Sequence, residues 1–195
     1  MYLFIDTLSE PTYICIFDET REIIDIRSWT GKQREFDTLT EEIDDLLSRN
    51  DITYEWLSGI VVMVWPGGFT GTRVTTLVAN TIGYSFNTPL FPLTVNEFFS
   101  YQKASLPWIT AITKKEVLLW NTDTSSPTIT LIHELPEGKY STLTPIDFTT
   151  PNHTIVIAKE YSRVIRSLPL SIAHERIKPI YARDPNITLK KTYAS

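Results

Sequence analysis

GIVVMVWPGGFTGTR, residues 59–73, is the stretch that decides the fold. Gly59–Trp65 is a continuous apolar run, which is typical of a strand buried on both faces. The residues that follow contain three of the chain's seven glycines within five positions, so they predict a tight turn. Apolar residues then recur at helical spacing over Thr72–Ile82, with Gly83 as the expected stop. The stretch therefore predicts a buried strand, a turn and a helix.

The glycines of this turn are Gly67, Gly68 and Gly71. They allow the backbone to approach a neighbour closely, and the helix after them presents free N–H groups at its positive end. Phosphate binding is one interpretation, and tight packing of the helix against the strand is the other. The segment is neither a P-loop nor a G-x-G-x-x-G motif, because the lysine and the spacing are absent.

Upstream of the deciding stretch, the pattern predicts a hairpin over Tyr2–Phe17 and a third strand over Glu22–Trp29. The period then changes to that of a helix over Phe36–Leu47. Its opposite face is acidic, which favours a solvated surface. The apolar stripe of this helix consists of Phe36, Leu39, Ile43, Leu46 and Leu47.

Downstream, Pro89–Leu93 is a short strand candidate, and Thr94–Tyr101 begins as a helix. Short β-rich runs separated by turns over residues 106–160 predict a small antiparallel lobe. Leu168–Ile177 suggests a short helix broken at Pro169. We therefore expect a first lobe over residues 1–104, a second over 105–178 and a returning tail over 179–195.

Composition places the chain among globular proteins, with 42% hydrophobic and 21% charged residues in 195. A single cysteine, Cys15, excludes an internal disulfide framework and a cysteine-rich zinc site. We expect it to be a small core residue, since it lies in the apolar run YICIF. No run approaches the roughly 20 apolar residues of a membrane span, and the start lacks a signal peptide pattern. The expected location is the cytoplasm.

Charge is unevenly distributed along the chain. Residues 1–100 carry 6 basic and 15 acidic side chains, and residues 101–195 carry 12 basic and 8 acidic ones. The acidic front half argues against direct binding of nucleic acid there. Seven basic residues between Arg163 and Lys191 form a solvated surface, a contact for an acidic protein, or an RNA contact.

The segment VWPGGFTGTRV, residues 64–74, resembles the G-P-G-S-F-T-G-x-R segment of the bacterial TsaB (YeaZ) family. Five shorter strings agree in order: FIDTLS at residues 4–9, GKQ at 31–33, NTPL at 87–90, TVNE at 94–97 and PIYAR at 179–183. The resemblance covers about residues 1–100 and 178–185. One departure is Arg34, which stands where the family usually has histidine.

The resemblance implies an α/β fold of the actin-like (ribonuclease H-like, ASKHA) type, with a mixed sheet, flanking helices and a smaller β-rich second lobe. It also implies a non-catalytic subunit that pairs with the catalytic subunit TsaD, works with the ATPase TsaE, and supports formation of N6-threonylcarbamoyladenosine (t6A) at position 37 of tRNA. Such proteins dimerise with themselves when alone, and contact tRNA only indirectly. The resemblance assigns the two predicted helices, over Phe36–Leu47 and Thr72–Ile82, to this pairing. The interface residues expected from them and from the turn between are Phe36, Leu39, Ile43, Leu46, Phe69, Thr70, Arg73 and Leu77.

The residues agree with a non-catalytic role. Asp6 is followed by Thr7 and Leu8, whereas nucleotide-hydrolysing relatives wrap phosphates with D-x-G. No H-x-x-x-H pair of the catalytic partner is present, and no cluster has metal-ligand spacing. We expect no cofactor and no metal, with ATP or ADP possible at a subunit junction. The residues that would then lie near nucleotide are Asp6, Thr7, Gly67, Gly68 and Gly71.

Two alternatives remain open at this point. The chain could be a small ATP-dependent kinase or ATPase that uses Asp6 and the glycine turn for phosphates. It could also be a binding module whose basic tail holds tRNA. Arg73 lies early in a helix, where a cation is unfavourable, so it is held either by a group within the chain or by another subunit or a phosphate.

Overall fold

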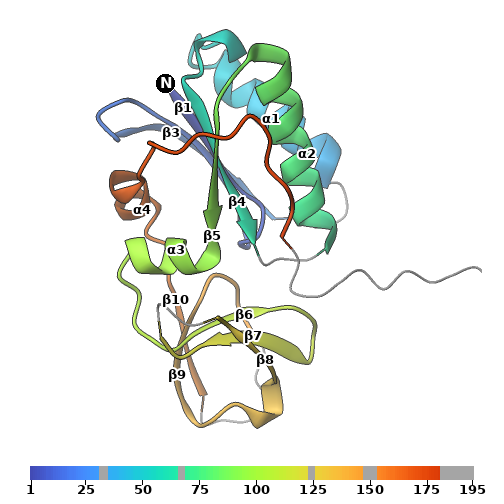
Figure 1. Ribbon diagram of the computed structural model, residues 1–195, viewed down its shortest axis with the longest axis vertical. Helices are drawn as coiled ribbons and strands as arrows, with labels where there is room; N and C mark the ends of the chain where they lie inside the picture. Colours follow the sequence, from blue (N-terminus) through green and yellow to red (C-terminus); the bar gives the residue numbers. More distant parts are fainter. Residues whose placement is uncertain (31–34, 66–68, 123–125, 147–152, 181–195) are drawn as a thin grey trace, which may run out of the picture.

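The computed structural model describes the backbone of residues 1–30, 35–65, 69–122, 126–146 and 153–180, and their side chains except those of 35–37, 65 and 69–71. Two five-stranded sheets form two lobes, one above the other in Figure 1. The first sheet has the order β3-β2-β1-β4-β5. Its strands are β1 (Tyr2–Asp6), β2 (Thr12–Phe17), β3 (Ile23–Trp29), β4 (Gly59–Trp65) and β5 (Leu90–Thr94).

The first sheet is mixed. Strands β1, β2 and β3 form an antiparallel meander, and β1, β4 and β5 are parallel. The predicted hairpin and the strand Gly59–Trp65 are confirmed. The parallel part exists because the long helices between its strands return the chain to the same end of the sheet.

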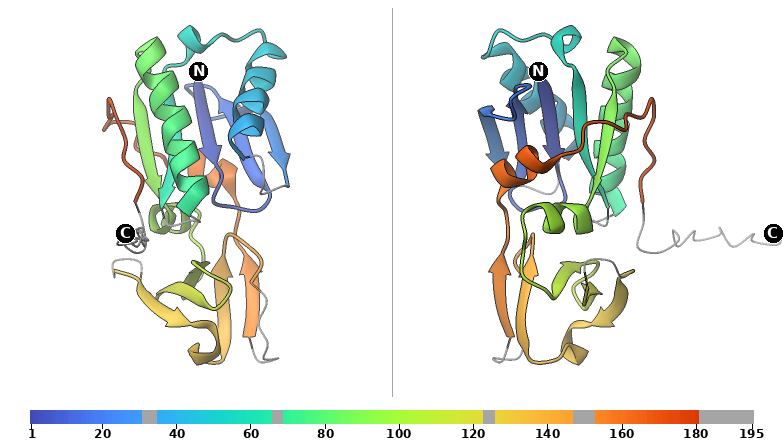
Figure 2. Two further views of the ribbon diagram at one scale, coloured as in Figure 1. Left: turned by 90° about the vertical axis from the view of Figure 1, so that its right-hand side faces the viewer. Right: turned by 60° about the vertical axis from the view of Figure 1, so that its left-hand side comes forward.

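Helices α1 (Glu35–Ser48) and α2 (Phe69–Phe86) lie side by side on one face of this sheet (Figure 2). Their apolar faces pack on the alternate residues of β1, β2 and β4, such as Leu3, Ile14 and Val62. α1 confirms the helix expected over residues 36–47.

Gly83 does not stop α2, because the helix continues to Phe86. Asn87 ends it instead, with a φ of 53°, and the amide of Thr88 reaches back to the carbonyl of Gly83 at 2.9 Å. Gly83 serves packing: a Cβ atom there would lie 3.0 Å from Leu90. The prediction mistook a close approach of helix and strand for a helix end.

The opposite face carries α3 (Val95–Tyr101) and α4 (Tyr161–Ser167). A capping box formed by Thr94 and Glu97 starts α3. The helix expected over Leu168–Ile177 is wrong. α4 ends at Ser167, and Leu168 is extended, because a residue before proline is disfavoured in the helical region.

The second lobe is built on β6 (Trp108–Ala111), β7 (Glu116–Trp120), β8 (Thr128–Leu131), β9 (Gly138–Thr142) and β10 (His153–Ile157) in the order β10-β9-β6-β7-β8. Two 3-10 turns complete the described elements, η1 (Tyr54–Trp56) in the first lobe and η2 (Ile132–Glu134) in the second. The antiparallel expectation is wrong for part of this lobe, because β9 pairs in parallel with both β6 and β10. Sequence reasoning missed β9, whose start it interpreted as a turn.

The lobes share one apolar core. Phe4 and Phe98 of the first lobe pack in the same cluster as Trp108 and Trp120 of the second. α4 belongs to this cluster too, although it falls within the expected second lobe. The lobe boundaries at residues 104 and 178 stay predictions.

Residues 168–180, called the strap below, cross the outer edge of β5 after α4 (Figure 1). Leu90 and His174 exchange two backbone hydrogen bonds of 3.0 and 2.8 Å. The side chain of Asn80 on α2 holds Ile177 through two more, both of 2.9 Å. The strap therefore covers a sheet edge that would otherwise be open to pairing with another chain. Within the part of the chain described, no helix is both long and apolar enough to cross a bilayer.

Candidate functional site

Asp6 ends β1 at the junction of the lobes, and it is fully buried. One carboxylate oxygen accepts hydrogen bonds from the amides of Leu8 and Ser9, at 2.8 and 3.0 Å. The other accepts from the hydroxyls of Ser9 and Tyr161, at 2.5 and 2.8 Å. Aspartate closes such turns readily, because its side chain reaches amides two and three residues later. Four internal donors thus occupy the carboxylate.

Tyr161 brings α4 to this site from the far end of the chain. Its ring stacks on that of Tyr13, with centroids 3.6 Å apart, and meets Phe4 and Phe98 edge-on. Burial raises the pKa of the Tyr161 phenol well above its ordinary value, and the negative charge of Asp6 adds to this. Burial likewise raises the pKa of Tyr13. Tyr161 therefore stays a hydrogen-bond donor to Asp6 at physiological pH.

Lys159, two residues before Tyr161, contacts the β1–β2 turn: its ammonium donates a hydrogen bond to the backbone carbonyl of Glu10. Burial lowers the pKa of Lys159, while the charges of Asp6 and Glu10 oppose that effect. Asp6, Ser9 and Tyr161 form a buried hydrogen-bonded network, and Lys159 adds a separate, partly buried contact to the β1–β2 turn.

The other residues expected near nucleotide are partly visible. The hydroxyls of Thr7 and Thr75 are hydrogen-bonded, which ties the β1–β2 turn to α2. Gly71 belongs to the first turn of α2, whereas Gly67 and Gly68 lie outside the described residues. Their nucleotide role stays a prediction.

Cys15 is buried in β2, as expected of a core residue, and burial raises the pKa of its thiol to about 12. It is therefore a neutral thiol at physiological pH. Across the described ranges, no group of three His, Cys, Asp or Glu side chains is arranged to hold a metal ion.

Replacing Tyr161 by phenylalanine removes one donor from Asp6 and leaves the stacked ring in place. We expect a loss of about 1.5 kcal/mol in the free energy of unfolding, because a buried carboxylate loses a hydrogen bond. Urea denaturation would measure it. Tyr84→Phe is the matched control, since Tyr84 is 90% exposed, and it should leave stability unchanged. Equal stabilities of the two variants would contradict the assigned role of the Tyr161 hydroxyl.

The expected interface residues on α1 require a correction. Leu39, Ile43 and Leu46 are fully buried in the chain's own core, between α1 and the first sheet. They are not available to a partner in this structure. The resemblance assigned this helix to pairing and the stripe supplied its residues, but an amphipathic stripe shows only that a helix face is covered and not by which surface. The side chains of Phe36, Phe69 and Thr70 lie outside the described residues.

The expected interface residues of α2 are placed differently. Arg73 and Leu77 are exposed, and with Thr81 and Tyr84 they make one row along the outer side of the helix. We call these four residues the α2 ridge. Leu77 is 56% exposed and Tyr84 is 90% exposed. Sequence reasoning missed Tyr84, although its position seven residues after Leu77 puts it on the same side.

The apolar character of this surface extends beyond the ridge. Phe86, at the end of α2, stacks on Tyr54 of η1, with centroids 4.9 Å apart. The neighbouring Trp56 is 65% exposed. A large aromatic side chain left in water is unusual, and several together mark an interaction surface.

The acidic side of α1 is partly neutralised within the chain. Arg27 of β3 pairs with Glu42, at 3.0 Å, and with Asp45. Asp44 accepts a 2.5 Å hydrogen bond from the hydroxyl of Tyr54. The acidic run is thus in part an internal contact between α1 and its neighbours as well as a solvated face.

Residues 33–105 match the family model described as TsaD, tRNA N6-adenosine threonylcarbamoyltransferase. No curated protein matches the chain significantly. Among solved structures, YeaZ from Pseudomonas aeruginosa is similar at 12% sequence identity and a TM-score of 0.58, with 85% of this chain and 89% of that chain covered.

A second structure, described as an uncharacterized protein with similarity to peptidase YeaZ from Pseudomonas aeruginosa, is similar at 13% identity and a TM-score of 0.65. The alignment covers 93% of this chain and 99% of that one. The two structures confirm the predicted two-lobed actin-like α/β fold. Together with the family-model match, they confirm the resemblance to the TsaB (YeaZ) family.

Proposed function

We propose that this chain, which folds like the YeaZ structures and carries a TsaD-type sequence segment, is a partner subunit in the synthesis of N6-threonylcarbamoyladenosine at position 37 of tRNA. It pairs with a TsaD-like catalytic subunit in the cytoplasm, alongside a TsaE-like ATPase. Alone, it forms a homodimer through the same surface. It has no catalytic site of its own and contacts tRNA only indirectly.

The α2 ridge is the observation that carries this proposal. Leu77 and Tyr84 stay exposed on the outer side of α2, although the opposite, apolar side of this helix packs on the first sheet. Arg73 at one end and Thr81 between them give the row a polar component. An aromatic and aliphatic row with an arginine has the composition of an interface core. The pairing surface is therefore the outer side of α2, with Trp56 at its margin, in place of the buried stripe of α1.

The non-catalytic part of the proposal is supported at Asp6. In the actin-like fold an aspartate at the end of the first strand serves phosphate chemistry, by the resemblance stated above. Here four internal donors occupy its carboxylate. In this proposal any ATP or ADP binds at the junction with the partner, near Thr7 and the glycine turn, rather than within this chain alone.

Size-exclusion chromatography with a TsaD-like subunit from the same source tests the pairing. We expect one heterodimer peak at micromolar concentration, because an interface built on packed helices buries well over about 1,200 Å². Two separate peaks would rule out stable pairing.

The rival function, an ATPase, predicts magnesium-dependent ATP hydrolysis by the isolated chain, abolished by Asp6→Asn. We expect no turnover in that assay.

A further inference from the structure

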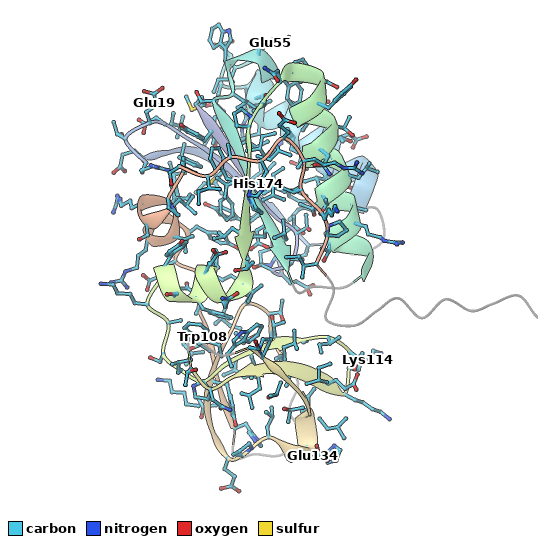
Figure 3. All side chains as sticks on the ribbon, viewed as in Figure 1. Glu19, Glu55, Trp108, Lys114, Glu134 and His174 are labelled. Carbon is cyan, nitrogen blue, oxygen red and sulfur yellow. The ribbon has the colours of Figure 1, made fainter. Side chains whose placement is uncertain are left out.

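A pocket of about 290 Å³ lies between the strap and the first sheet. Its walls come from β4, β5, α3 and the strap, and most of its lining is aliphatic, aromatic or proline, as Leu93, Leu170 and Ile180 illustrate. The volume is at the lower end for small-molecule sites, which span roughly 300 to 1,000 Å³. His174 of the strap, labelled in Figure 3, borders the pocket in front of β5. No member of the α2 ridge lines it.

A single carboxylate gives this apolar pocket its charge. Glu97 of α3 lines it, and no lysine or arginine does so among the described residues. One oxygen of Glu97 is fixed by the amide and the hydroxyl of Thr94, at 2.8 and 2.5 Å. Within the described part of the chain, the other oxygen has no hydrogen-bond donor. The capping box therefore orients a carboxylate and leaves half of it available.

Two further polar side chains border the same space. Tyr101 follows Glu97 by four residues on α3, and burial, assisted by the charge of Glu97, raises the pKa of its phenol. His174 lines the pocket from the strap. Both kinds of side chain can accept a hydrogen bond: a phenol through its oxygen, and an imidazole, when it is neutral, through one ring nitrogen. The described residues give neither side chain a hydrogen-bond partner.

We propose that this pocket binds a small molecule with an apolar body and one primary ammonium group. The apolar lining takes the body, and the ammonium donates to the available oxygen of Glu97, with Tyr101 and His174 as further acceptors. A carboxylate beside apolar surface is costly unless it is paired, and a cation supplies that pair. An anionic ligand would face Glu97 with no compensating cation in the described lining. The site is independent of the proposed pairing through α2.

Phenethylamine is a suitable probe, because it joins an aromatic body to a primary ammonium. 2-Phenylethanol is its uncharged counterpart, and 3-phenylpropionate is an anionic one. Each probe is titrated into the full chain, and binding is measured by calorimetry and by amide chemical shifts. We expect phenethylamine to bind about tenfold more tightly than the alcohol. The propionate should not bind. Shifts should concentrate on α3, β5 and the strap.

Glu97→Gln removes the charge but keeps the capping box, which accepts glutamine as well as glutamate. We expect this variant to bind phenethylamine about tenfold more weakly, with binding of the alcohol unchanged. Glu55→Gln, on the exposed η1 turn at the far end of the first lobe (Figure 3), is the matched control and should bind like the parent. Circular dichroism checks that both variants are folded. Equal affinity for amine and alcohol, an unaffected Glu97→Gln variant, or shifts centred outside the pocket would each overturn the proposal.

Discussion

Replacing Leu77 and Tyr84 together by aspartate is expected to weaken binding of the TsaD-like subunit at least about 100-fold. Both side chains are exposed in the free chain, at 56% and 90%, so their replacement removes no core packing. On pairing, however, each aspartate would be taken out of water without a partner, and the apolar contacts would be lost. Isothermal titration of the double variant against the parent measures the effect.

The matched control for this variant is Ile129→Asp. Ile129 is 42% exposed on β8 of the second lobe, away from α2, so its replacement adds an aspartate at another exposed apolar position. Its affinity should remain within about twofold of the parent value, as surface changes outside an interface have small effects. If the double variant binds as tightly as this control, the α2 ridge is not the pairing surface.

Ile43→Ala on α1 should lower the free energy of unfolding by about 3 kcal/mol, because it removes a fully buried side chain and leaves a cavity under the helix. Chemical denaturation gives this value. The folded variant should still bind the TsaD-like subunit with unchanged affinity, because Ile43 faces the chain's own sheet.

Glu41→Ala, on the exposed side of the same helix, serves as the comparison and should change stability by less than about 0.5 kcal/mol. This pair of variants separates the two roles that an amphipathic stripe can have. A large loss of partner affinity in folded Ile43→Ala, with little loss of stability, would restore the interface role that the sequence pattern assigned to the residue.

Much of the first lobe could be predicted from local pattern. The apolar runs of β1, β2 and β4 and the helical stripes depend on neighbours in sequence, and these elements were expected close to their observed bounds, apart from the two ends of α2. Asn87 shows the limit of such reasoning: a left-handed residue ended α2 four positions after the glycine that the pattern favoured. Gly83 was instead required by Leu90, a contact that only the tertiary structure reveals.

The site was harder to predict, because its members come from distant parts of the chain. Asp6 was singled out from its place after a strand, but Tyr161, which holds it, lies 155 residues away. The pocket under the strap was not expected, because its lining joins β4, β5 and α3 to a distant segment that was expected to be a helix over Leu168–Ile177. On α2, the resemblance named Leu77 as an interface residue, and the structure leaves this side chain 56% exposed; its interface role stays a prediction. Spacing predicts which residues share a face and does not say what covers that face.

The strap has a consequence for how the protein is made. A ribosome delivers β5 long before residues 174–177, and the whole second lobe is synthesised in between. Until those residues emerge from the ribosome, the outer edge of β5 is unpaired in the nascent first sheet. Until α4 emerges, the Asp6 carboxylate also lacks its hydrogen bond from the hydroxyl of Tyr161. The first lobe therefore cannot finish folding until the C-terminal quarter of the chain has been synthesised. A prematurely terminated polypeptide leaves both lobes incomplete, and we expect chaperones and proteases to act on it.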